Sequence, residues 1–155
     1  MSQLCVRSDT CFAKVTLRAG PDRPGIAAEL FGRLGAEGFN IELLVSTGGG
    51  QGQADISFVI KKDELPAVLQ MLDRLKGELG AQKVEHQVGL ALIGVAGQDL
   101  NKKPGIAGRM FRALSRQGIN IDVISTSLSS VTCAIDERMV QEAQTAVRQE
   151  FAADI

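Results

Sequence analysis

The sequence predicts an α+β protein of two ferredoxin-like βαββαβ modules, each an antiparallel four-stranded sheet with two helices on one face. The first supporting observation is an internal repeat, because residues 24–44 and 104–124 match without a gap at nine of 21 positions. The second is the order of hydrophobic patterns in each half, which reads strand, helix, strand, strand, helix. The third is the length of 155 residues, which suits two modules of roughly 70 residues.

The repeat retains residue types that helix packing alone does not require. Two unrelated amphipathic helices would share apolar character, but they would not keep a proline, two glycines and an asparagine in register. We therefore interpret the repeat as an internal duplication. The identical pairs are Pro24/Pro104, Gly25/Gly105, Ile26/Ile106, Ala27/Ala107, Phe31/Phe111, Leu34/Leu114, Gly38/Gly118, Asn40/Asn120 and Ile41/Ile121.

Composition narrows the class of protein. The chain is 45% apolar and 23% charged, with a net charge of −1 and no Trp or Tyr. It therefore lacks the basic surface and the aromatic platforms that bind nucleic acid. No apolar run is long enough for a signal peptide or a membrane span, so we expect a soluble cytoplasmic protein. Cys5, Cys11 and Cys133 have no metal-binding spacing, and we expect reduced, buried or half-buried thiols.

The first module begins with an alternating run at residues 12–18, which predicts a half-buried strand. The segment 19–25 carries two prolines and two glycines, which predict a turn. A helix follows from Ile26, because apolar residues recur at helical spacing. We expect Gly38 to end that helix as a left-handed cap.

The next elements are two strands, at residues 40–47 and 54–60, joined by a flexible glycine-rich turn at 48–52. Asp63 is a candidate N-cap of a second helix, and Pro66 lies in its first turn. The predicted core face of this helix comprises Leu65, Val68, Leu69, Leu72 and Leu75. Residues 83–88 close the module as a fourth strand.

The second module repeats this order. We expect a strand, a turn, a helix and two strands at residues 90–96, 97–105, 106–117, 120–126 and 130–135. A last helix begins at Asp136 and buries Met139, Ala143, Val147 and Phe151.

No fourth strand follows this last helix, so a strand at residues 3–6 is expected to complete the second sheet. The expected organisation is therefore an N-terminal strand in 1–11 that belongs to the second module, a first module at 12–89 and a second at 90–155.

The chain offers no catalytic constellation. His86 is the only histidine, and we expect it on the surface, so no histidine pair or zinc cluster can form around it. The glycine-rich run 48–52 lacks the lysine and the following helix of a phosphate-binding loop. We therefore expect no catalysis by this chain alone, and no metal or other cofactor.

The repeated Pro-Gly turn ahead of a helix suggests a binding site. A helix N-terminus presents unpaired N–H groups that attract a carboxylate, and Asp22 stands beside it as an acceptor for an ammonium group. Together they describe a site for a free α-amino acid. The alternative is that Pro-Gly only supplies the turn that the fold requires. We expect Asp55, beside the glycine-rich hairpin, to be solvated.

These motifs resemble the ACT domain, a small βαββαβ module that binds amino acids and regulates metabolic enzymes. The residues that carry the resemblance are KVTLRAGPDRPGIA at 14–27 and NIE at 40–42. In the second half, GVAG at 94–97, KPGIA at 103–107, NIDVISTS at 120–127 and CAID at 133–136 resemble the regulatory part of aspartate kinases. That family also begins its regulatory part with a strand that completes the second module.

The resemblance implies effector-binding residues in both modules. Carried over by position, they are Asp22, Pro24, Gly25, Ile26, Ala27, Asn40, Ile41, Ser46, Thr47, Lys103, Pro104, Gly105, Ile106, Ala107, Asn120 and Ile121. Ser46 and Thr47 stand where many relatives have Gln-Asn, Ala54 replaces a threonine, and Leu128 replaces a glutamate. The first-module departures leave the identity of the effector open.

The resemblance implies an allosteric regulatory part of aspartate kinase, which mediates feedback inhibition by lysine, threonine or both. The implied partners are a second copy of the chain, in a homodimer, and a kinase catalytic domain or subunit. A free-standing ACT sensor that controls another enzyme or a transcription factor is the alternative. The small subunit of acetolactate synthase is a weaker one, since its second half does not usually repeat the PGIA helix.

Overall fold

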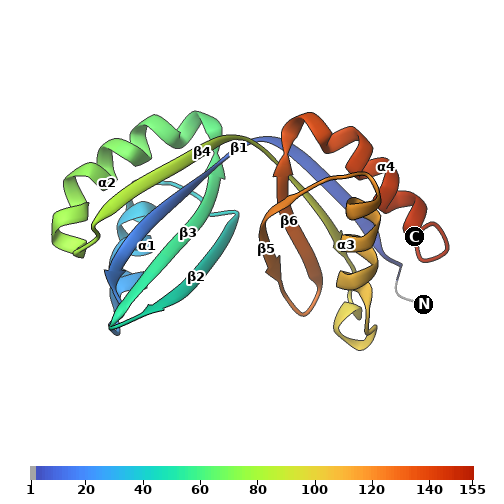
Figure 1. Cartoon of the computed structure of the whole chain (residues 1–155), viewed down its shortest axis with the longest axis horizontal. Coiled ribbons are helices and arrows are strands. Elements are labelled where there is room, and N and C mark those ends of the chain that lie inside the picture. The colour runs from blue at the N-terminus through green and yellow to red at the C-terminus, as the bar shows by residue number, and fades with distance from the viewer. Residues whose placement is uncertain (1–2) are drawn as a thin grey trace. The chain divides into compact units, whose positions relative to one another are not determined.

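The computed structural model describes residues 3–155, which divide into two compact units. One unit is Phe12–Val88, and the other joins residues 3–11 to 89–155. Two long strands, β1 (Cys5–Pro21) and β4 (Lys83–Ala96), run through both units (Figure 1). Hydrogen-bonded strands follow the order β2-β3-β1-β4-β6-β5, so each unit contains four strand segments in the arrangement predicted for a βαββαβ module.

The unit Phe12–Val88 buries one face of its sheet under two helices. Its remaining elements are α1 (Ile26–Ala36), β2 (Leu43–Gly50), β3 (Gln53–Lys61), a 3-10 turn (Lys62–Glu64) and α2 (Leu65–Leu79). Ala13, Val15 and Leu17 of β1 face the helices and pack with Leu30 and Leu34 of α1. The predicted core face of α2 lies in the same cluster, with Leu69 only partly buried.

The other unit has the same construction. Its elements are a 3-10 turn (Leu100–Lys102), α3 (Ile106–Arg116), β5 (Ile121–Thr126), β6 (Ser130–Asp136), a further 3-10 turn (Glu137–Met139) and α4 (Val140–Glu150). Leu4 and Val6 are buried in its core, and the Leu4 N–H donates to the Asp154 carbonyl over 2.9 Å. Ala143, Val147 and Phe151 are buried as predicted, whereas Met139 is only partly buried because it lies in the 3-10 turn before α4. The N-terminal segment thus completes this module, as the fold prediction required.

The predicted breaks between modules do not end the strands. Strand β1 contains residues 5–6 of the predicted segment 3–6 together with all of 12–18, and strand β4 contains both 83–88 and 90–96. In each strand a single residue at the unit boundary is left-handed, Cys11 with φ 69° and Gly89 with φ 75°. One left-handed residue interrupts the alternation of buried and exposed positions, so the sequence pattern reads as two separate strands. The strand itself continues on both sides of that residue.

The prediction that segment 19–25 is a turn was also partly wrong. Strand β1 continues to Pro21, with Gly20 opposite Ala54 and Pro21 opposite Gln53. A register shift lies between Leu17 and Gly20. Such a bulge accommodates an extra residue, and a proline is tolerated where a strand terminates because no ladder N–H is needed there.

The glycine-rich hairpin is tighter than predicted. Strand β2 begins at Leu43 rather than at residue 40 and continues through Gly50. Only Gln51 and Gly52 form the turn, with φ values of 54° and 73°. Two positive φ angles match the right-handed twist of a two-residue hairpin.

Of the predicted helix ends, the C-terminal glycine is confirmed and the N-terminal caps are not. Gly38 and Gly118 end their helices with φ values of 84° and 68°, as predicted for Gly38. Asp63 does not cap α2: it lies in a 3-10 turn, and the residue before α2, Glu64, makes no side-chain cap. Asp136 likewise precedes a 3-10 turn instead of α4, and its side chain accepts from the Arg138 N–H.

Surface exposure corrects the prediction for two cysteines. Cys133 is buried, whereas Cys5 and Cys11 are exposed. His86 is exposed, as predicted. Within residues 3–155 there is no helix with the length and apolar character needed to cross a membrane.

Candidate functional site

The two Pro-Gly turns have nearly the same backbone. Gly25 precedes α1 with φ 92° and ψ −13°, and Gly105 precedes α3 with φ 89° and ψ −3°. This left-handed conformation favours glycine, because a Cβ would strain the backbone. The recurrence of glycine therefore has a structural cause, independent of any ligand.

The helix ends behind these glycines carry no side-chain cap. In α1 the Gly25 carbonyl accepts from the Glu29 N–H at 2.9 Å, and the Ile26 N–H makes a long 3.4 Å bond to Arg23. The N–H groups of the first helical turn have no intrahelical acceptor and give the helix end a partial positive charge. Such an end is suited to a carboxylate.

Asp22 lies on the surface between the end of β1 and this helix end. Its backbone N–H donates to the Gly52 carbonyl at 2.8 Å, which ties the turn to the β2–β3 hairpin. In the second module Lys102 occupies the position of Asp22, 80 residues later, and forms an ion pair with Asp99 at 2.9 Å. Only the first module has a carboxylate beside its helix end at this position.

Asn40 and Ile41 lie beyond the other end of α1, and Asn120 and Ile121 beyond the other end of α3. A helix of 11 residues is about 16 Å long. Asn40 is exposed and donates from Nδ2 to Glu42 Oε1 at 2.9 Å. The structure therefore does not bring Asn40 and Ile41 to the Pro-Gly turn of the same module.

Ser46 and Thr47 are exposed on β2, at the edge of the strand order. Thr47 pairs with Asp55, and the next pair along, Gly48 with Ala54, lies level with Gly20. The end of β2 thus lies toward the same end of the sheet as the turn at Asp22.

A small apolar pocket lies under the first turn, lined among others by Pro21, Ile26, Ala54 and Leu79. A water-sized sphere can occupy only about 10 Å³ inside it, which is about the space of one water. An amino-acid ligand would therefore contact the outer side of the turn.

Second-module residues are arranged similarly. Pro104 and Gly105 are exposed, Lys103 and Ala107 are half-buried, and Ile106 is buried in the core. In the first module Ile26 is half-buried and Ala27 is exposed, as is Pro24.

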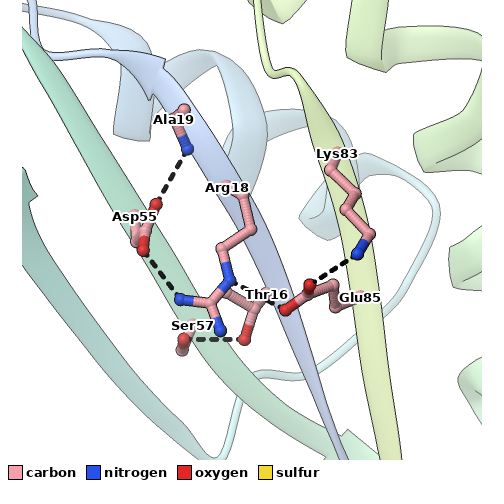
Figure 2. A network of polar contacts seen from close by, with 7 residues as sticks. All are labelled: Thr16, Arg18, Ala19, Asp55, Ser57, Lys83 and Glu85. Carbon is pink, nitrogen blue, oxygen red and sulfur yellow. Dashed lines mark hydrogen bonds and ion pairs between the residues drawn. The ribbon is translucent and has the colours of Figure 1, made fainter.

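A polar network next to the first turn was not predicted (Figure 2). Asp55 Oδ1 accepts the Ala19 N–H at 2.8 Å, and Oδ2 forms an ion pair with Arg18 Nη1 at 2.8 Å. Arg18 Nε reaches Glu85 Oε2 at 2.8 Å, and Glu85 also pairs with Lys83 at 2.9 Å. Asp55 keeps 36% of its side-chain surface exposed. Its two carboxylate oxygens are nevertheless both paired, which its place near the hairpin did not predict.

The contacts in this network favour the ionised forms of the Asp55 and Glu85 carboxyl groups. The Ala19 N–H, followed by the Arg18 guanidinium, holds the pKa of the Asp55 carboxyl below its ordinary value. Hydrogen bonds from Lys83 and then Arg18 lower the pKa of Glu85. Side chains along β1 and β3 alternate between the two faces of the sheet, and this alternation places Arg18 and Asp55 on the face away from the core. It is the one feature of the sequence that indicates that the two residues lie on the same face.

Comparison with known proteins identifies both units. Residues 15–77 match the family model described as ACT domain, and residues 93–151 match a second ACT-domain model. An aspartate kinase of Stutzerimonas stutzeri is 30% identical over 142 residues, covering 92% of this chain and 34% of that protein. The chain spans about a third of the length of the curated relatives it matches.

Solved structures agree. The ligand-free regulatory subunit of aspartate kinase from Thermus thermophilus superposes with a TM-score of 0.86 at 28% identity, covering 97% of both chains. Aspartate kinase from Synechocystis gives 0.88 at 32% identity, covering 95% of this chain and 26% of that one. The chain consists of two domains of the ACT family and is homologous to the regulatory regions of aspartate kinases.

Proposed function

We propose that this chain is the amino-acid-binding, allosteric regulatory part of a cytoplasmic aspartate kinase and mediates feedback inhibition by lysine, threonine or both. The observation that carries the proposal is the N-terminus of α1 behind Gly25, which has no side-chain cap, with the exposed Asp22 in the turn that leads into it. Similarity to aspartate kinase regulatory regions supports it.

The ligand's two charged groups match this end of the module. The α-carboxylate would accept from N–H groups of the first turn of α1, in the region of Ala27, and the α-ammonium would meet Asp22. In the second module, Lys102 at the equivalent place would repel the ammonium group. We therefore propose that the first module holds the main effector site.

A second copy of the chain would supply the rest of the site. Asn40 and Ile41 lie about 16 Å from the turn of their own module, the length of α1. Strand β2 is an edge strand, and an antiparallel partner would place its own residues 40–41 beside the turn. Leu44 on β2 and Ile124 on β5 leave 45% and 43% of their surface exposed. Exposed apolar residues on an edge strand suit a homodimer contact at 40–46 and 120–126.

Regulation would then follow from preferential binding. An effector held between copies stabilises the arrangement that completes its site, and so it shifts the population of that arrangement. This shift would lower the activity of a kinase catalytic domain or subunit attached to the pair. The coupling is reciprocal, so kinase ligands would change effector affinity by the same factor.

A thermal-shift screen of the twenty L-amino acids tests the proposal. We expect lysine or threonine to raise the melting temperature and D-isomers and aspartate to leave it unchanged. Ligand at 100 times its Kd adds about 2.7 kcal/mol to the free energy of unfolding. A flat screen would contradict effector binding, and a response to branched-chain residues alone would contradict the assignment to aspartate kinase regulation.

Sedimentation tests the dimer separately. We expect the chain to sediment as a dimer at tens of micromolar with its effector present. A monomer both with and without amino acids would contradict a site shared between copies.

A further inference from the structure

The turn that carries Asp22 follows directly on a bulge in β1. The register of β1 shifts between Leu17 and Gly20, and Ala19 adopts φ 51°. A left-handed alanine costs free energy that glycine would not, so neighbouring contacts must hold it. The backbone of Ala19 therefore sets how β1 leads into the turn.

Asp55 supplies the contact that holds this residue. Its Oδ1 accepts the Ala19 N–H at 2.8 Å while Arg18 occupies Oδ2 at the same distance (Figure 2). Arg18 is anchored on its other side by Glu85 of β4. The carboxylate is thus held from two sides, by the Arg18 guanidinium and by the backbone N–H of Ala19 within the bulge.

The second module has neither the bulge nor a carboxylate at the equivalent place. The opposed pairs Leu17/Ile56 and Val95/Val131 align the two modules, so Ser130 is the counterpart of Asp55 and Ala96 that of Arg18. There the amide of Gly97, the counterpart of Ala19, donates to the Ser129 backbone carbonyl at 2.9 Å. The charged support is a property of the first module, the same module that has Asp22.

We propose that Asp55 is the positioning residue of the first module's effector turn: through Ala19 it fixes the path by which β1 delivers Asp22 and the N-terminus of α1. It touches no effector itself. The expected effect of Asp55 on effector affinity rests on the proposed function. Its effect on the position of the turn can be measured without any ligand.

The test combines amide hydrogen exchange with affinities for L-lysine and L-threonine. In Asp55→Ala we expect the amides of Ala19 and Asp22 to exchange at least about tenfold faster, and affinity for the effector to fall about tenfold. Asp55→Asn keeps an oxygen acceptor for the Ala19 amide and should restore both. Arg18→Gln keeps the Ala19 bond, so affinity should stay within about fivefold of the wild type.

Ser130→Ala is the matched control in the second module, where exchange at Gly97 should not change because its acceptor is a backbone carbonyl. Unchanged Asp22 exchange in Asp55→Ala would overturn the positioning role. Faster exchange with unchanged affinity would overturn its consequence for binding. If the wild-type chain binds neither amino acid, the proposed function fails, while the exchange rates still decide whether Asp55 positions the turn.

Discussion

The guanidinium carbon of Arg109 lies 4.4 Å from the centroid of the Phe151 ring. The same side chain pairs with Glu150 at 2.9 Å and with Asp154 at 3.0 Å. The hydrogen bond that Arg109 donates to the Glu150 carboxylate raises the pKa of the Arg109 guanidinium above its ordinary value. One residue of α3 therefore holds the end of α4 and the segment after it.

Arg109→Ala should lower the free energy of unfolding by about 1–2 kcal/mol, because ring stacking and packing of the aliphatic stem are both lost. Chemical denaturation measures the change. Arg112→Ala, at an exposed position on the same helix, is the control and should stay within about 0.5 kcal/mol of the wild type. Equal effects would mean that the Phe151 contact contributes little.

Substitutions of Gly25, which precedes α1, and of Gly32 within α1 should act in opposite directions. Gly25→Ala places a Cβ at φ 92° and should cost about 1–2 kcal/mol. Gly32→Ala lies inside the same helix with no atom within 4 Å of the new Cβ and should add about 0.5–1 kcal/mol. Melting curves of the two variants decide it. Destabilisation by both would refute the claim that only Gly25 is needed for its backbone conformation.

The cysteines should differ in reactivity. Burial raises the pKa of the Cys133 thiol to about 12, whereas Cys5 and Cys11 are exposed. A thiol reagent at pH 8 should modify two thiols in the folded chain and the third only after unfolding. The raised pKa also means that Cys133 favours folding below pH 9, and this contribution is lost as pH rises toward 12. Three equally reactive thiols in the native chain would contradict the burial of Cys133.

Asp136 should titrate at unusually low pH. The Arg138 side chain, and then its backbone N–H, lower the pKa of the Asp136 carboxyl from 3.8 to about 2. Its contribution to stability is therefore present above pH 3.8 and lost as pH falls toward 2. A carboxyl-detected NMR titration should show this pKa rising in Arg138→Gln. A pKa near the ordinary 3.8 for Asp136 in the wild-type chain would contradict the hydrogen bonds from Arg138.

The elements were predictable because each module encodes its own periodicity. Leu30 and Leu34 mark the buried face of α1, and Gly38 its end, within a few residues of sequence. The continuity of β1 was not predictable, because it depends on one left-handed residue, Cys11, whose side chain carries no turn signal. Glycines 48–50 were assigned to a turn because their pairing with β3 is a tertiary contact that local propensity does not report.

The candidate site was predictable only in part. The Pro-Gly turns are local motifs, and their duplication makes them visible. Asp55, however, reaches Ala19 across 36 positions of sequence, and no spacing rule links a strand carboxylate to a bulge in its neighbour. The separation of Asn40 from Asp22 was implicit in the sequence, since α1 lies between them, and it is what makes a second copy necessary for a site that uses both.

Titration calorimetry of the wild-type chain and Asp22→Ala with L-lysine and L-threonine tests the central claim most directly. At least one L-amino acid should bind the wild-type chain, its D-isomer should not, and Asp22→Ala should lose about 2–4 kcal/mol of binding free energy. The loss should exceed that of Asp55→Ala, because in the proposed site Asp22 pairs with the ammonium group directly. Equal affinities of wild-type chain and Asp22→Ala, or a larger loss in Asp55→Ala, would contradict an effector site at the N-terminus of α1.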